Sequence, residues 1–166
     1  MQLWAPFVAE SLTALQADNK ATQRSLGIIR PDPGSVEFRV KRIEDTAKDN
    51  QEVTAQVFEQ ASLLEDPLKP MPKPEYSFRY AFTSGGKTHD YQIHDWEVQA
   101  AYFNYRRQYG REAMDRLIDV YQNTIPNQHL HLIMGTMQKR PWQFIIIGLL
   151  RAPLDPKELE MQGELF

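Results

Sequence analysis

The sequence predicts an α+β fold, in which an antiparallel sheet is covered on one face by a pair of helices. Three patterns support this prediction. Aromatic side chains alternate with small or polar ones over residues 76–83, which is the period of a half-buried strand. Residues 95–122 place apolar side chains at helical spacing, interrupted at Gly110, and residues 142–150 form an apolar strand. The predicted order of this core is therefore β-β-α-α-β-β.

The first part of the chain is predicted to extend that core. Residues 6–26 have the spacing of a helix that begins at a proline and stops at Gly27. Residues 36–40 alternate like a strand, and residues 51–64 return to helical spacing. Four prolines in residues 66–74 indicate an extended connector, because proline fixes φ and cannot join a sheet ladder. We therefore divide the chain into an N-terminal subdomain (1–65), a proline-rich connector (66–75), a main domain (76–151) and an acidic tail (152–166).

Each element of the main domain has a local cause. Two alternating segments flank a glycine-rich turn at residues 84–87, which is typical of a β-hairpin. Asp95 fits the N-cap of the helix that follows, and Gly110 fits its end. The remaining predicted elements are a second helix over 111–122 and two strands over 129–134 and 142–150, the last apolar on both faces and therefore central.

The glycine-rich turn also satisfies a loose form of a phosphate-binding loop, from Ala81 to Thr88. In such a loop Lys87 would contact the phosphates and Thr88 would hold magnesium. That function requires a buried parallel strand before the glycines and a helix N-terminus after them. Alternation on both sides predicts strands instead, so we expect a hairpin turn here.

The composition bounds the class of protein. With 166 residues, 42% hydrophobic and 25% charged, the chain suits one ordinary globular domain. The absence of cysteine excludes disulfides, thiolate metal sites and cysteine nucleophiles. The longest apolar run, residues 144–150, is far shorter than the ~20 residues that cross a bilayer, and no secretory leader is visible. We therefore expect a cytoplasmic protein without a membrane partner.

Charge is distributed unevenly along the chain. Residues 76–151 carry nine Lys and Arg against six Asp and Glu, whereas both flanks are net acidic. A basic middle favours an anionic partner, and tyrosines among the arginines offer faces on which bases stack. Alternatively, Tyr102, Tyr105 and Tyr109 form the core face of a helix and the arginines its solvated edge. The candidate nucleic-acid contacts are Arg106, Arg107, Arg111, Arg116, Lys139 and Arg140.

A metal site is the alternative interpretation of the same region. All four histidines fall between residues 89 and 131. His129 and His131 lie two apart on a predicted strand, so their rings would point the same way, and His94 would join them if the strands are neighbours. Such a site could activate water for phosphodiester hydrolysis. A solvated sheet face would explain the same histidines without a metal.

The chain ends in Gln162-Gly163-Glu164-Leu165-Phe166 after an acidic tail. This ending resembles the bacterial sliding-clamp-binding peptide, in which a glutamine is followed by a terminal Leu-Phe pair. The resemblance implies that Gln162 hydrogen-bonds at the pocket rim and that Leu165 and Phe166 fill adjoining pockets. Gly163 departs from the pattern, where leucine is usual. Alternatively, the two apolar side chains pack on the core or on another partner.

Three functional hypotheses follow. The leading one is a non-catalytic, DNA-associated accessory protein without a cofactor, which contacts DNA through its basic middle and a protein partner, such as the replication sliding clamp, through its tail. The second is a small nuclease or phosphoesterase that uses a divalent metal at the histidines. The third is a subunit of a larger complex that makes protein contacts only.

Overall fold

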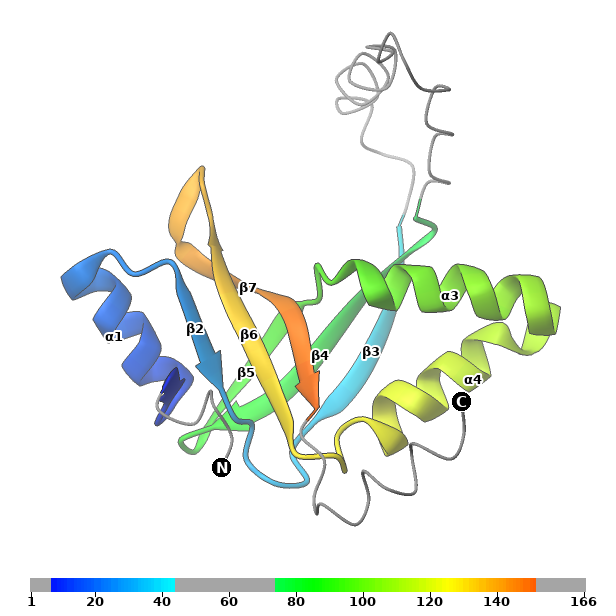
Figure 1. The fold of residues 1–166 in the computed structure, drawn as a ribbon, viewed down its shortest axis with the longest axis horizontal. Helices are drawn as coiled ribbons and strands as arrows, with labels where there is room; N and C mark the ends of the chain where they lie inside the picture. The colour runs from blue at the N-terminus through cyan, green and yellow to red at the C-terminus, as the bar shows by residue number, and fades with distance from the viewer. Residues whose placement is uncertain (1–6, 44–73, 152–166) are drawn as a thin grey trace, which may run out of the picture. The chain divides into compact units, whose positions relative to one another are not determined.

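The structure is a computed structural model that describes residues 7–43 and 74–151, and it confirms the α+β class. The described residues form three α-helices and seven strands (Figure 1). In chain order these are β1 (Val8–Ala9), α1 (Leu12–Thr22), β2 (Leu26–Ile29), β3 (Glu37–Arg42), β4 (Tyr76–Ser84), β5 (Lys87–Gln92), α3 (Trp96–Tyr109), α4 (Ala113–Asp119), β6 (Leu130–Met137) and β7 (Arg140–Arg151).

The strands divide between two sheets, with the orders β1-β2-β6-β7 and β3-β4-β5. The β2–β6, β6–β7 and β4–β5 pairs are antiparallel, whereas β1 pairs with β2 in parallel. Within the described ranges, an isolated parallel bridge between Ile93 and Ile146 joins the two sheets, and His94 N–H donates to the Ile146 carbonyl at 2.6 Å. The prediction that β7 is a central strand is therefore wrong: β7 lies at the edge of its sheet. The outer side of β7 meets the chain just after β5, at Ile93.

Helix α1 begins later and ends earlier than its periodicity predicts. The N-cap is Ser11, whose hydroxyl accepts from Ala14 N–H at 3.1 Å. The Leu12 N–H donates to the hydroxyl of Ser84, a residue 72 positions away, at 3.0 Å. Residues 8–9, predicted to be helical, instead pair with β2, and Gly27 lies within β2 rather than marking the end of a helix.

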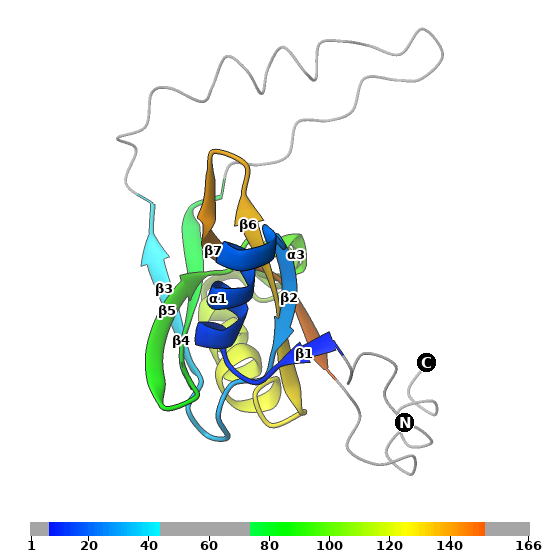
Figure 2. The same ribbon diagram turned by 90° about the vertical axis from the view of Figure 1, so that its left-hand side faces the viewer.

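Helix α1 packs between the two sheets (Figure 2). Leu12 and Leu15 are 0% and 2% exposed. A Cβ added at Gly27 would lie 2.3 Å from Leu15 Cδ1, so the glycine lets β2 approach the helix closely. On the other side of α1, the Gln16 side-chain amide donates to the Tyr91 hydroxyl at 3.2 Å.

The predicted hairpin is confirmed. β4 and β5 pair in register from Arg79–Gln92 to Ser84–Lys87, and the turn places Gly85 and Gly86 at φ 59° and 76°. Positive φ at both central residues is what a tight hairpin turn requires. A strand, and not a helix, follows the glycines, so the turn lacks the context of a phosphate-binding loop.

The predicted helical pair is also present. The Asp95 carboxylate caps α3 by accepting from Glu97 N–H at 2.9 Å. The predicted second helix is divided into a 3₁₀ turn (Gly110–Glu112), α4 and a π-helical turn (Val120–Thr124). This segment packs on the β3-β4-β5 sheet. The Phe38 and Tyr121 rings stack with their centres 5.2 Å apart, and the Tyr80 hydroxyl donates to the Tyr121 carbonyl at 2.8 Å.

The chain divides into two compact units. Residues 7–40 and 78–151 belong to one, and the other is Lys41–Ser77. Because β2 pairs with β6, residues of the predicted N-terminal subdomain and of the predicted main domain share one sheet. The predicted helix over 51–64, most of the connector and the tail lie outside the described residues. None of the helices described is both long and apolar enough to span a membrane.

Candidate nucleic-acid interface

The turn between β6 and β7 exposes a group of basic and apolar side chains that we name the hairpin tip, residues 137–142. Met137 and Arg140 are the last paired residues before the turn. Trp142 is 66% exposed and Met137 37% exposed, while Lys139 and Arg140 are also exposed. Two large apolar side chains, Trp142 and Met137, thus lie largely in water close to two cations, which makes this tip a candidate contact surface.

The hairpin tip is positively charged. Residues 120–151 contain no Asp or Glu, so no acid of β6 or β7 offsets Lys139 and Arg140. The Arg140 guanidinium donates to the Gln143 side-chain oxygen at 3.2 Å, a neutral partner. Among the described residues Lys139 has no partner. Two cations beside an exposed indole can pair with phosphates while the ring stacks on a base.

A second exposed tryptophan lies in the opposite electrostatic setting. Trp96, 62% exposed, opens helix α3 between Asp95 and Glu97. Both carboxylates suit the positive end of the helix dipole, and Asp95 is the N-cap. Trp96 is therefore about as exposed as Trp142, but its neighbours are acidic where those of Trp142 are basic.

The remaining predicted contacts lie at the corner between α3 and α4. Arg106, Arg107 and Arg111 are exposed there. Arg107 donates to the Asn104 side chain at 3.2 Å. The Arg116 guanidinium lies 4.1 Å from the centre of the Tyr109 ring and 3.6 Å from a Glu112 carboxylate oxygen, so it is already engaged.

The structure does not bring the six predicted basic residues together. In Figure 1 the β6–β7 turn lies at the upper left and the α3–α4 corner at the right edge. The tyrosines of α3 serve mainly as packing: Tyr102 is 5% exposed, and Tyr105 and Tyr109 contact each other edge to face at 5.8 Å.

The three histidines of the predicted metal site also stay apart. His129 lies before β6, with φ 47°, and its Nδ1 accepts from the Arg30 guanidinium at 3.1 Å. His131 is 6% exposed within β6, and its Nδ1 contacts the His129 carbonyl at 2.8 Å. His94 adjoins β7 at Ile146, and partial desolvation lowers its pKa. In the described part of the chain, no three His, Cys, Asp or Glu side chains form a group that could hold a metal ion.

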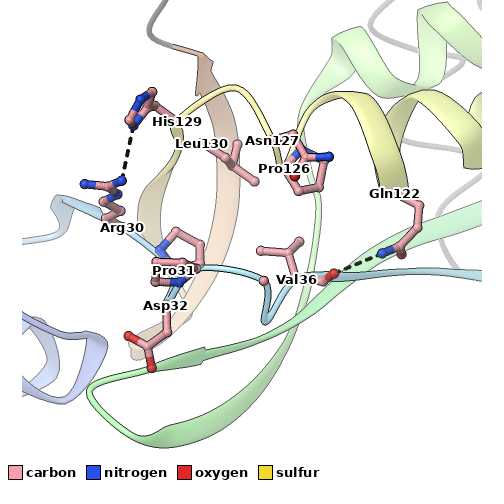
Figure 3. A pocket seen from close by; sticks show the side chains of 11 residues that line it. Arg30, Pro31, Asp32, Val36, Gln122, Pro126, Asn127, His129 and Leu130 are labelled. Carbon is pink, nitrogen blue, oxygen red and sulfur yellow. Dashed lines mark hydrogen bonds between the residues drawn. The ribbon is translucent and has the colours of Figure 1, made fainter. Parts of the chain in front are cut away.

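A pocket with a volume of about 390 Å³ opens between the β2–β3 connection and the start of β6 (Figure 3). Its rim carries Arg30, with His129 beside it. The Asp32 carboxylate accepts from Gly86 N–H at 3.4 Å. The Thr83 hydrogen bond lowers the pKa of Asp32 and, together with the N–H groups of Gly86 and Gly85, outweighs desolvation, which raises it.

Sequence reasoning did not identify Trp142 as a functional residue. The pattern Arg140-Pro141-Trp142 stands out as the entry to an apolar strand, but the sequence alone attaches no function to it. A tryptophan next to Lys-Arg-Pro, in a stretch of 32 residues without an acid, was the available signal. The predicted partner-binding residues Gln162, Leu165 and Phe166 lie outside the described residues.

A family model with the description "Domain of unknown function (DUF8757)" matches residues 8–166, which is nearly the whole chain. Neither a curated protein nor a solved structure matches it.

Proposed function

We propose that this chain, which belongs to the family of the domain of unknown function DUF8757, is a non-catalytic accessory protein that binds single-stranded DNA. The observation that carries the proposal is the exposed Trp142 beside Lys139 and Arg140 on a hairpin without acids. The hairpin tip would contact the strand, with the cations on phosphates and the indole on a base.

Single strands fit this surface better than duplexes do. A base within a duplex is stacked on its neighbours and offers its face only after unstacking, whereas a single strand presents its faces freely. The chain as a whole has a net charge of −3, so binding by diffuse attraction over the whole surface is disfavoured. A local basic tip with one stacking platform therefore favours a short contact on a single strand.

The test is fluorescence anisotropy of a labelled single-stranded oligonucleotide and its duplex over a salt series. Each phosphate contact contributes about 0.7 to the slope of log affinity against log salt for single strands. We expect Lys139→Ala/Arg140→Ala to weaken binding and to reduce that slope by about 1.4. Trp142→Ala should weaken binding by about 1–3 kcal/mol and leave the slope unchanged, since it removes stacking and no charge.

One matched control and one further test variant complete the experiment. Trp96→Ala removes an equally exposed indole in an acidic setting and should bind like the wild type. Arg106→Ala/Arg107→Ala removes two charges from the α3–α4 corner and tests whether that group takes part. The proposal fails if Trp142→Ala and Lys139→Ala/Arg140→Ala both bind as the wild type does, or if no strand binds at low salt.

The tail carries a second proposal, that this protein docks on a replication sliding clamp. The supporting observation is the Gln162, Leu165 and Phe166 pattern, which lies inside the region matched by the family model. Clamp binding by surface plasmon resonance should be lost in Leu165→Ala/Phe166→Ala and kept in Glu164→Ala. Equal binding of the two variants would contradict it. The histidine nuclease alternative receives no support, because the described residues do not gather its ligands.

A further inference from the structure

The four-stranded sheet has a face that points away from helix α1, and we name it the outer face. A Cβ added at Gly27 would collide with the Leu15 side chain, so this position of β2 faces the helix. Side chains alternate along a strand and paired residues point the same way, so the neighbours of Gly27 and their partners on β6 and β7 face away from α1. Figure 2 shows α1 between β2 and β4. The outer face consists of Leu26, Ile28, Ile133, Ile145, Ile147 and Leu150.

The side chains of the outer face are all aliphatic, and they remain partly in water. Leu26 is 57% exposed and Ile147 38% exposed, and the other four are each partly exposed. The opposite face of the same strands is closed, since Leu132, Met134 and Ile146 are fully buried. Single exposed apolar side chains are common on protein surfaces, whereas a contiguous group of them on one sheet face indicates a surface that binds a partner.

Two glycines let the side chains of the outer face lie flat. A Cβ added at Gly135 would lie 2.9 Å from Ile147 Cδ1, and one added at Gly148 would lie 3.1 Å from Ile133 Cδ1. The two isoleucines therefore lie across places where other side chains would stand. A flat sheet face covered by aliphatic side chains is the kind of surface that packs against another sheet, at a distance of about 10 Å.

The outer face carries no charge, which restricts the partner that it suits. From the hairpin tip to Leu150, none of the outward positions described on β2, β6 and β7 holds Lys, Arg, Asp or Glu. His131, an ionisable residue at an outward position of β6, is only 6% exposed. In a two-fold dimer each face lies against an identical face, so a charge on it would be brought near a like charge. An uncharged apolar face avoids this repulsion, and it offers a charged partner no attraction.

We propose that the outer face binds a second copy of this chain, so that two copies form a two-fold dimer with sheet face against sheet face. The hairpin tips would lie at opposite ends of the interface, because Lys139 and Arg140 of one copy would otherwise approach those of the other. Three short strands offer a small interface, so we expect a dimer that dissociates at micromolar concentrations and not an obligate one. The proposal does not depend on DNA binding by the hairpin tip.

Sedimentation equilibrium of the full chain without DNA tests the proposal, over concentrations from about 1 µM to about 500 µM. We expect the apparent mass to rise with concentration from 19.3 kDa toward twice that value. Ile147→Lys should weaken the association at least ~10-fold, since it brings an unpaired charge into the apolar interface. Ile118→Lys is the matched control: Ile118 is 37% exposed on α4 and not on the sheet, so this variant should associate as the wild type does.

Cross-linking locates the interface, because the chain has no cysteine and a single introduced one reacts selectively. Ile147 lies over β6, the middle of the three strands, so its two copies come close across a two-fold axis through the face. A bismaleimide that spans about 10 Å should join Ile147→Cys into a covalent dimer, and Ile118→Cys should stay monomeric. Circular dichroism checks that each variant is folded. A wild type that is monomeric at every concentration, equal association of the two Lys variants, or equal cross-linking of the two Cys variants would overturn the inference.

Discussion

The ring of His89 is packed in a place where it cannot easily accept a proton. It lies 5.6 Å from the Phe82 ring and 6.1 Å from the Tyr91 ring, centre to centre. Its Nε2 is buried and has no hydrogen-bond partner in the described structure. Desolvation lowers the pKa of His89, and the charge of Lys87 lowers it further, against an opposing hydrogen bond from the Ser84 backbone. The folded protein therefore favours the neutral form of this imidazole.

We predict that His89 makes the protein less stable in mild acid. Because the pKa of His89 is lowered in the folded state, the unfolded chain takes up the proton first as pH falls below the ordinary value of 6.5. The stability contributed above that pH is therefore lost progressively below it. His89→Phe keeps the ring packing and removes the titration. Urea unfolding at pH 7.5 and pH 5 should show a smaller loss in the variant; an equal loss would contradict the prediction.

At the level of single residues, the sequence predicts burial better than it predicts contacts. Alternation correctly places Phe78, Tyr80 and Phe82 on the inner face of their strand, since each is at most 1% exposed. The same alternation cannot show that Trp142 stays in water, because exposure depends on how far the hairpin extends beyond its neighbours. The pairing of Arg30 with His129 joins residues 99 positions apart, and no local pattern records it.

Among the elements, helix α1 shows where local reasoning fails. A proline at position 6 and apolar residues at helical spacing suggest an early start. The start is set instead by Ser11 and by the hydroxyl of Ser84 on another strand. Residues 8–9 are not helical because they pair in parallel with β2. The paired residues are about twenty positions apart in the sequence. Helix α3 was predicted well because both of its ends, Asp95 and Gly110, are determined locally.

The β3-β4-β5 sheet carries a cross-strand charge cluster on its outer face. Asp90 on β5 accepts from Arg79 on β4 at 2.6 Å and from Arg39 on β3 at 2.8 Å. Desolvation raises the pKa of Asp90, but the hydrogen bonds and charges of Arg79 and Arg39 outweigh it and lower the pKa overall. One carboxylate thus links all three strands of the sheet.

We predict that Asp90→Asn lowers the free energy of unfolding by about 0.5–1 kcal/mol at neutral pH, a modest value because the cluster is partly exposed. A lowered pKa means that this stability is present above the ordinary pKa of 3.8 and is lost as pH falls through the folded value. The difference between variant and wild type in urea unfolding should therefore shrink at acid pH, and also in high salt. A difference that is constant from pH 7 to pH 2.5 would show that the charge is irrelevant.

At the scale of the whole molecule, helix α1 packs against both sheets, which the Ile93–Ile146 bridge joins among the described residues. We predict that Leu12→Ala lowers the free energy of unfolding by about 2–5 kcal/mol, since Leu12 is fully buried and its truncation would leave a cavity. Leu26→Ala is the matched control: that leucine is 57% exposed, and its loss should cost less than about 0.5 kcal/mol. Urea unfolding followed by tryptophan fluorescence and by circular dichroism checks both. Similar losses in the two variants would contradict the packing of α1.

The global arrangement is the part that the sequence cannot supply. The α+β class and the order of strands and helices along residues 76–151 follow from local patterns, and both are predicted correctly. The division of the strands into two sheets depends on the pairing of β2 with β6, which joins residues more than one hundred positions apart. A strand that is apolar on both faces was expected at the centre of a sheet, but β7 is instead apolar at a sheet edge that meets β5 through Ile146.

The pairing of Ile43 with Glu75 has a consequence for engineering. Ile43 N–H donates to the Glu75 carbonyl at 2.9 Å, and these residues extend the neighbouring strands β3 and β4. The chain therefore leaves the sheet after Ile43 and re-enters it before Glu75, at adjacent points. This place in the chain is therefore a suitable site for insertion or replacement. Residues 44–73 can be exchanged for a two-residue turn, or for a reporter domain whose own termini lie close together, and each described strand would keep its neighbours.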